Sequence, residues 1–195
     1  MARTPWQRRP SPPRSPRSAA RSRIPLGVTT GAWAAADPTE RLAEVNAWRV
    51  LPDFASVNWH EPGAEELAAA LLDCGVGVEA GLWTPASVAR WNRWPHRDRC
   101  LRVLLEVVDD LRPEHAIAAA AGLVDVLDAG AVPVLLHGEN SSAWPVLADA
   151  VRRGLDIRIG LEDVLVLPDG RAARDNAALV AAALGLARGS AFTAS

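Results

Sequence analysis

The chain has 195 residues, of which 49% are hydrophobic and 23% are charged, and its formal net charge is −2. A chain of this length can bury a substantial core as one domain. It has neither an apolar run of about 18 residues nor a signal-peptide pattern, so the sequence argues against a membrane span or secretion and predicts a cytoplasmic protein. Cys74 and Cys100 lack metal-ligand spacing, and we expect reduced, buried thiols.

Residues 1–23 differ in composition from the rest of the chain. They hold seven Arg, five Pro and no acidic residue, whereas residues 24–195 hold 14 Arg and all 23 acidic residues. We predict a disordered leader, because an Arg/Pro/Ser segment has too little apolar surface to offset the entropy of ordering. A nucleic-acid-binding arm and a transit peptide are alternatives, but neither is favoured: Trp6 is the leader's only aromatic residue, and five prolines interrupt an amphipathic helix.

From Ile24 onward, short β-branched runs alternate with longer Ala/Leu-rich stretches. The predicted strands are residues 24–30, 53–60, 76–83, 100–108, 132–138 and 156–163. Their starts lie 23 to 32 residues apart, which is the spacing of βα units and indicates a parallel sheet. Pro or acidic residues predict helix starts at Asp37-Pro38, Pro62-Gly63, Thr84-Pro85, Arg112-Pro113, Ser141-Ser142 and Asp175-Asn176, with the last helix ending at Gly189.

Six parallel units fit either a doubly wound sheet or part of a (β/α)8 barrel. Residues 27–33 (GVTTGAW) lack the Gly-rich phosphate-binding pattern of nucleotide-binding sheets. Polar residues instead recur near the carboxyl ends of the strands, where a barrel builds its active site. These are Thr29, Thr30, Asn58, His60, Glu79, Glu106, His137, Glu162 and Asp163. The sequence therefore predicts an α/β fold that is an incomplete (β/α)8 TIM barrel of about six βα units over residues 24–195.

The alternation of side chains along a strand predicts which of these residues point together. Ser56, Asn58 and His60 share one face of their strand, and Glu79 lies between two glycines that leave room around its carboxylate. A lone Glu in an apolar strand favours a functional role over a structural one.

Arg158 and Glu162 share a face of the last predicted strand, and Asp163 follows where that strand ends. Two interpretations stay open, an internal ion pair or a functional site, because an unpaired buried charge is costly. His137 is equally compatible with a ligand or base and with a turn, whereas His96 and His115 have the surroundings of surface residues.

Five segments together carry a family resemblance. They are GVTTGAW (27–33), LPDFASVNWHEPG (51–63), GVGVEAGLW (75–83), LLHGENSSAWPVL (135–147) and RIGLEDVLVLPDGRAARDNAALV (158–180). The chain resembles the β-keto acid cleavage enzyme family, whose named member is the 3-keto-5-aminohexanoate cleavage enzyme. The resemblance covers nearly all of residues 24–195, and the Arg-x-Gly-x-Glu-Asp block is its most specific part.

The resemblance implies a zinc-dependent (β/α)8 barrel and an acyltransferase reaction. A β-keto acid condenses with acetyl-CoA, and a retro-Claisen step releases a CoA ester and acetoacetate. It implies Glu162 as a zinc ligand beside a His-x-His pair, Asp163 as the catalytic acid/base, Arg158 as the group that stabilises negative charge, and Glu79 as support for proton transfer. The substrate contacts that it implies are Thr29 or Thr30, Ser56 and Asn58. It also implies a homo-oligomer, either a dimer or a tetramer.

The chain departs from this pattern at the metal. None of its four histidines has another two residues away, so Glu162 is the only family zinc ligand present. A single carboxylate cannot hold zinc at useful affinity. We therefore expect an N-terminally truncated barrel, strands three to eight of eight, that is inactive alone and associates through its open edges. The abrupt change of composition at Ile24 favours a mis-called or frameshifted start.

Two other functions are consistent with the sequence. A catalytically silent fragment would act only in assembly with other barrel chains. A nucleic-acid-binding protein guided by the basic leader would show binding that weakens with salt.

Overall fold

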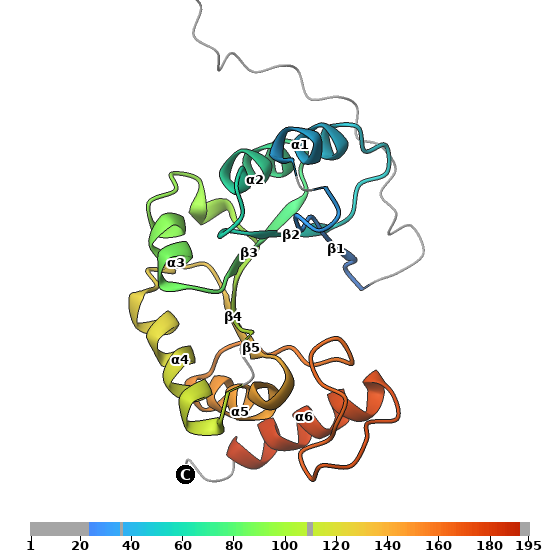
Figure 1. The fold of residues 1–195 in the computed structure, drawn as a ribbon, viewed down its shortest axis with the longest axis vertical. Coiled ribbons are helices and arrows are strands. Elements are labelled where there is room, and N and C mark those ends of the chain that lie inside the picture. Colours follow the sequence, from blue (N-terminus) through green and yellow to red (C-terminus); the bar gives the residue numbers. More distant parts are fainter. Residues whose placement is uncertain (1–23, 36, 109–110, 192–195) are drawn as a thin grey trace, which may run out of the picture.

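The computed structural model describes residues 24–35, 37–108 and 111–191. The leader predicted over residues 1–23 lies outside these ranges. The described part of the chain is an α/β fold built on one parallel sheet (Figure 1).

Five strands form the sheet, in the order β1-β2-β3-β4-β5. They are β1 (Gly27–Thr29), β2 (Phe54–Asn58), β3 (Gly77–Leu82), β4 (Arg102–Val107) and β5 (Val134–Gly138). All four pairings are parallel, and each strand lies beside the next one in the sequence. A doubly wound sheet reverses its order at one point, whereas a barrel does not. The sheet is therefore consistent with part of a TIM barrel.

The helices follow one another around the outer side of the curved sheet, with the last one beyond α5 (Figure 1). They are α1 (Pro38–Asn46), α2 (Ala64–Asp73), α3 (Pro85–Asn92), α4 (Pro113–Val126), α5 (Ala143–Arg153) and α6 (Asn176–Ala191), with short 3₁₀ turns at Arg97–Arg99 and Asn140–Ser142. The predicted starts are confirmed. Asp37, for example, caps α1 by accepting hydrogen bonds from the backbone amides of Thr39 and Glu40 at 2.8 and 3.0 Å.

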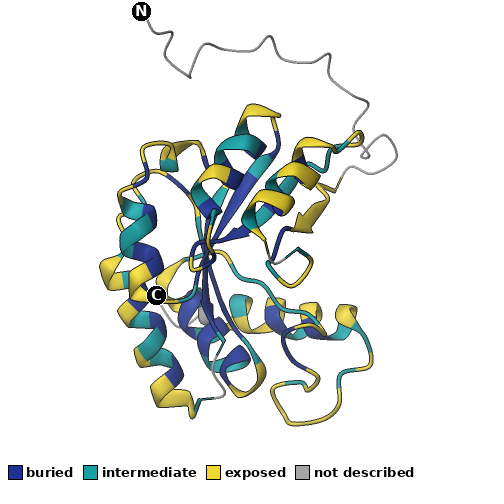
Figure 2. Ribbon diagram, turned by 45° about the horizontal axis from the view of Figure 1, so that its top comes forward, coloured by how far each residue is buried: buried dark blue, intermediate teal, exposed yellow. Residues whose placement is uncertain are grey.

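The two faces of the sheet differ in chemistry because successive side chains alternate. The residues that pack against the helices are apolar and fully or almost fully buried (Figure 2). They include Ala55 and Val57 of β2, Val78, Ala80 and Leu82 of β3, and Val103, Leu105 and Val107 of β4. The opposite, concave face carries most of the polar side chains of the strands. The core thus lies between the sheet and the helices, and it leaves the concave face for chemistry.

The predicted sixth strand, residues 156–163, is wrong. This segment pairs with β5 only at Asp156, opposite Leu135, where two hydrogen bonds of 3.0 Å join it to the sheet. It then leaves the sheet and turns at residues 161–163. Two sets of contacts hold it there: Arg158 pairs with Glu162 and Asp163 of its own segment, and Asn176 Oδ1, at the start of α6, accepts the amide of Leu161 at 2.7 Å.

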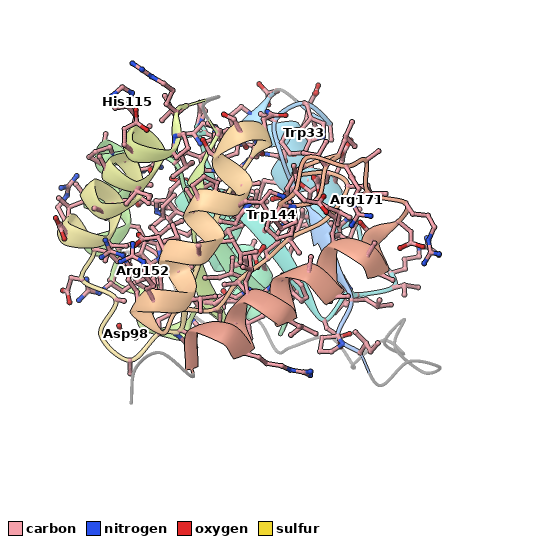
Figure 3. The ribbon with its side chains drawn as sticks, turned by 90° about the horizontal axis from the view of Figure 1, so that it is seen from below. Trp33, Asp98, His115, Trp144, Arg152 and Arg171 are labelled. Carbon is pink, nitrogen blue, oxygen red and sulfur yellow. The ribbon has the colours of Figure 1, made fainter. Side chains whose placement is uncertain are left out.

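The end of the last helix is also corrected, since α6 continues past Gly189 to Ala191. α6 packs against α5, as Figure 3 shows from below. The indole of Trp144, on α5, donates a hydrogen bond of 2.8 Å to the carbonyl of Val166. This bond ties the loop between the two helices to α5.

None of the helices in the described part of the chain combines the length and the apolar character needed to cross a membrane.

Of the two thiols, Cys100 is buried as expected, whereas Cys74 at the end of α2 is exposed. Burial raises the pKa of the Cys100 thiol to about 11, because a buried thiolate loses its hydration.

We predict that iodoacetamide at pH 8 labels Cys74 at least about a hundredfold faster than Cys100, since only the thiolate reacts. Mass spectrometry of the native chain measures this, with Cys74→Ser as the control that leaves only the slow site. Equal labelling rates would contradict the burial of Cys100.

Candidate active site

One row of polar residues crosses the concave face of the sheet. Thr29, Ser56, Glu79 and Arg102 are successive Cα partners in the register of β1 to β4. Because residues paired across a parallel sheet share a face, their side chains point to the same side. Four strands therefore contribute one polar side chain each at the same level.

A cavity of about 480 Å³ lies over this row. Its lining is Gly27, Val28, Thr29, Trp33, Phe54, Ser56, Asn58, Glu79, Trp83, Arg102, Leu104, Glu106, Glu139, Arg158 and Glu162. Six of the predicted site residues are among them, one or two from each of β1, β2, β3 and the segment after β5. The cavity carries four carboxylates against two guanidinium groups, so it is acidic.

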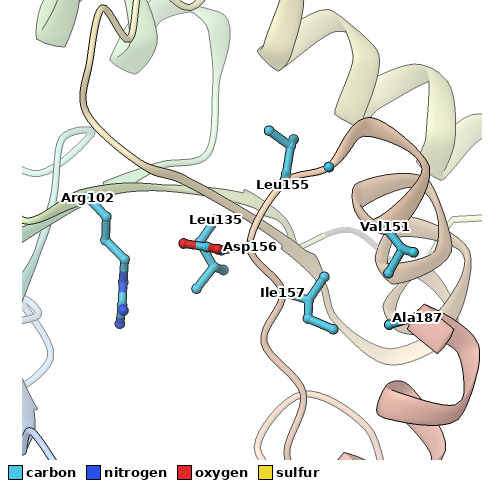
Figure 4. Close-up of a pocket in the computed structure, with 8 residues that line it drawn as sticks. Arg102, Leu135, Val151, Leu155, Asp156, Ile157 and Ala187 are labelled. Atoms are coloured by element: carbon cyan, nitrogen blue, oxygen red, sulfur yellow. The ribbon is translucent and has the colours of Figure 1, made fainter. Parts of the chain in front are cut away.

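A second hollow, of about 510 Å³, lies between β5, α5 and α6 (Figure 4). Apart from Arg102 and Asp156, its lining is apolar or glycine: Leu135, Val151, Gly154, Leu155, Ile157 and Ala187. Although it is slightly larger, it gathers only these two charged groups. The acidic cavity is the better candidate for chemistry.

Glu79 supplies the carboxylate of this row. Its side chain is 7% exposed and makes a short ion pair with the guanidinium of Arg102 on the next strand. Arg102 also lies over the ring of Phe54, 5.0 Å from the ring centroid. Arg102, however, was not among the predicted site residues.

Arg158 joins the segment after β5 to the cavity. Its Nη2 donates to Glu162 Oε2 and to Asp163 Oδ1, both at 2.9 Å. The ion pair that the sequence left open therefore exists, but Arg158 is shared between two carboxylates. Burial opposes its charge, yet Asp163, Glu162 and Glu106 outweigh burial and raise the pKa of Arg158. Glu162 is 84% exposed on its side chain, whereas Asp163 is 1% exposed.

His137, buried on β5, links Asp163 to the sheet. Its Nε2 lies 3.6 Å from Glu106 Oε2, and its Nδ1 lies 3.6 Å from Asp163 Oδ1. These separations exceed a hydrogen bond, and neither ring nitrogen nor Asp163 Oδ2 has a hydrogen-bond partner within the described ranges. The ring thus lies between the two carboxylates, and of these three residues only Glu106 lines the cavity.

Glu139 adds a further acidic group to the cavity wall. Its partial burial raises its pKa, and repulsion from Glu106 acts in the same direction. Burial is thus the main cause of its raised pKa, and the neighbouring negative charge adds to it.

The predicted hydroxyl and amide residues divide into two groups. Thr29, Ser56 and Asn58 line the cavity. Thr30 does not, because its hydroxyl donates to the carbonyl of Ser56 at 2.7 Å in the interior. His60, which shares the parity of Ser56, lies beyond the strand end, is exposed, and packs on Trp83 with 4.2 Å between ring centroids.

Comparison with known proteins now identifies the family. The family model for the β-keto acid cleavage enzyme matches residues 17–192. The chain belongs to this family. No curated protein matches the chain. The β-keto acid cleavage enzymes are generally metal-dependent, and membership supports the cleavage of β-keto acids as the activity class.

The residues of this β-keto acid cleavage family member that the structure describes do not fit a zinc site. No three His, Cys, Asp or Glu side chains among them are grouped closely enough to hold a metal ion. Glu162, the ligand that the resemblance implies, is almost fully exposed and bonded to Arg158. One carboxylate already engaged by a guanidinium is a poor donor set for zinc.

Three charged residues of the site went unassigned in the sequence interpretation: Arg102, Glu106 and Glu139. Glu106 was recognised only as a polar residue at a strand end. The parity of β4 could have found Arg102, because Arg102, Leu104 and Glu106 alternate with the apolar Val103 and Leu105. Glu139 lies past the end of β5, where strand parity no longer predicts direction.

The ion pair of Glu79 and Arg102 is open to a stability test. Arg102→Met leaves a buried carboxylate without its partner, and we predict a loss of about 1–3 kcal/mol in the free energy of unfolding. The double variant Glu79→Gln/Arg102→Met should recover most of it, because no unpaired charge remains. Urea denaturation measures both. The control is Arg99→Met, whose partner Asp73 is exposed and 3.7 Å away, and which should change stability by less than about 0.5 kcal/mol. An equal loss in Arg102→Met and Arg99→Met would contradict the pairing.

The raised pKa of Glu139 predicts a pH dependence of stability. The native carboxyl binds its proton more tightly than the unfolded one, so the wild type loses stability as pH rises from the ordinary value of 4.5 through the raised value. Glu139→Gln does not titrate there. Its stability relative to wild type should therefore rise with pH across that window, as urea midpoints between pH 4 and 8 would show. Glu66→Gln, at an exposed position on α2, is the control. The same pH trend in both variants would refute the assignment.

Proposed function

We propose that this chain binds a β-keto acid in the acidic cavity and takes part in its cleavage with acetyl-CoA as the co-substrate. The acyl group that contains the keto carbon passes to CoA as the bond to the α-carbon breaks, and the remaining two carbons leave joined to the acetyl group of acetyl-CoA as acetoacetate. Two things support the proposal: membership of the β-keto acid cleavage family and the gathering of Glu79, Arg158 and Glu162 around one cavity.

The observation that carries the proposal is the pairing of Arg158, which lines the cavity, with the buried carboxylate of Asp163. Cleavage requires removal of a proton from the carbon between the keto and carboxylate groups, and negative charge then develops on oxygen. A buried carboxylate next to a guanidinium suits the first task, and the guanidinium suits the second. Glu79, fixed by Arg102, would orient polar groups on the opposite wall, and Ser56 and Thr29 would donate hydroxyl hydrogen bonds to the substrate.

Zinc and the 3-keto-5-aminohexanoate specificity are finer proposals. The described residues do not fit zinc, so we assign no step to it. We expect that turnover requires metal ligands beyond Glu162, and that the chain by itself is inactive. Identification of the β-keto acid requires a substrate panel, because loops set specificity in barrels.

Turnover can be tested by supplying the absent ligands. We would fuse a His-x-His strand segment of a family enzyme upstream of Ile24 and measure CoA-ester formation from acetyl-CoA and a panel of β-keto acids, including 3-keto-5-aminohexanoate. Arg158→Met and Asp163→Asn should each lower kcat/KM by at least about 100-fold, the usual effect of losing a general acid/base.

The matched controls are Arg171→Met and Asp169→Asn, which disrupt an exposed ion pair of 2.7 Å outside the cavity and should retain activity. Full activity in Asp163→Asn, or no CoA ester from any β-keto acid with the zinc-loaded fusion, would rule out the proposed function.

A further inference from the structure

A buried carboxylate outside the cavity organises two of its walls. Glu61, in the loop after β2, is 8% exposed. Its Oε1 accepts hydrogen bonds from the Asn58 side-chain amide and from the backbone amide of Ala32, both at 3.0 Å. Its Oε2 accepts from Nη1 of Arg41 at 2.6 Å. Glu61 therefore connects β2, the loop after β1 and helix α1.

Arginines from two helices hold this loop in place. Arg41 of α1 is 3% exposed, and its Nη2 donates to the carbonyl of Pro62 at 2.5 Å. Arg90 of α3 donates to the carbonyls of Trp59 and Glu61 at 3.2 and 3.3 Å. Side-chain donors thus satisfy the loop carbonyls from both sides. The position of the Glu61 carboxylate is fixed by the layer of helices and not by the cavity.

The bond from Glu61 determines which way the Asn58 amide faces. Because the amide nitrogen donates to Glu61, the amide oxygen is left for the concave face. It lies above Gly81, where an added Cβ would come within 2.7 Å of Oδ1. Gly81 is the register partner of Asn58, and its missing side chain makes the space for this oxygen. Asn58 therefore presents a hydrogen-bond acceptor at the cavity wall.

The same oxygen of Glu61 also holds the other wall. The amide of Ala32 is anchored to it, and Trp33, the next residue, lines the cavity although it is 70% exposed. The Glu61 carboxylate thus holds both the Asn58 amide and Ala32, the residue before Trp33 in the loop after β1, which we call the Trp33 loop.

The pair of Arg41 and Glu61 is costly to bury, and apolar residues of similar volume would commonly give equal stability. A geometric role explains why charged groups occupy this place. We propose that Glu61 is a positioning residue of the site: it orients Asn58 Oδ1 into the cavity and anchors the Trp33 loop. This proposal rests on the proposed function only in taking the ligand to be a β-keto acid.

The test uses the full chain labelled with ¹⁵N-asparagine and, separately, uniformly with ¹⁵N. Asn58→Asp identifies the Asn58 side-chain signal. Glu61→Leu should shift that signal and speed exchange of both the Asn58 side-chain protons and the Ala32 amide by about tenfold, the equivalent of one hydrogen bond. Acetoacetate should also bind more weakly, with a dissociation constant about tenfold higher when measured by titration.

A rescue variant separates positioning from charge. Arg41→Met/Glu61→Gln removes the ion pair but keeps an amide oxygen where Glu61 Oε1 accepts from Asn58 and Ala32. It should restore the wild-type Asn58 signal, slow exchange and acetoacetate affinity. Glu66→Leu, an exposed position on α2, is the matched control and should change none of them.

Unchanged Asn58 and Ala32 signals in Glu61→Leu would overturn the proposal, as would a rescue variant as impaired as Glu61→Leu. If Glu61→Leu does not fold, the rescue variant decides alone: wild-type signals support positioning, and lost signals refute it. A wild-type chain that does not bind acetoacetate counts against the proposed function, while the exchange data still decide the role of Glu61.

Discussion

The alternation of side chains along the parallel strands is the constraint on which the structure depends. In β2, β3 and β4, every second residue is apolar and packs against the helices. The residues between them face the cavity and include Ser56, Glu79 and Arg102. A shift of one residue in any pairing would put charges into the helix layer and apolar residues into the cavity. The register therefore fixes the core and the candidate site at once. Stability and chemistry use opposite faces of the same strands.

Charge balance in the cavity follows from that separation. The concave face gathers more carboxylates than guanidinium groups. Each arginine of the cavity pairs with a buried acid: Arg102 pairs with Glu79, and Arg158 pairs with Asp163. Glu139 has a raised pKa, first because it is partly buried and second because Glu106 repels it. A β-keto acid would enter a site in which proton acceptors are already held by cations, which suits removal of a carbon-bound proton.

Rigid support comes from outside the cavity. The loop after β2 is held by Arg41 and Arg90 from two helices, and Glu61 passes that constraint to Asn58 and Ala32. Polar groups that are fixed before a ligand arrives cost less to organise when it binds. The helix layer thus contributes to the site without contacting the cavity.

The sequence alone determined the βα order, five of the strands, the helix starts and the family, because these depend on local periodicity, capping residues and short motifs. It also predicted that Ser56 and Asn58 share one face of their strand, since strand parity is local. Only the tertiary structure decided that residues 156–163 leave the sheet, that Arg102 pairs with Glu79, and that Thr30 turns inward. These outcomes depend on partners that are distant in the chain, or on two carboxylates that share one arginine, as Glu162 and Asp163 share Arg158. The periodicity of the sequence carries no information about either.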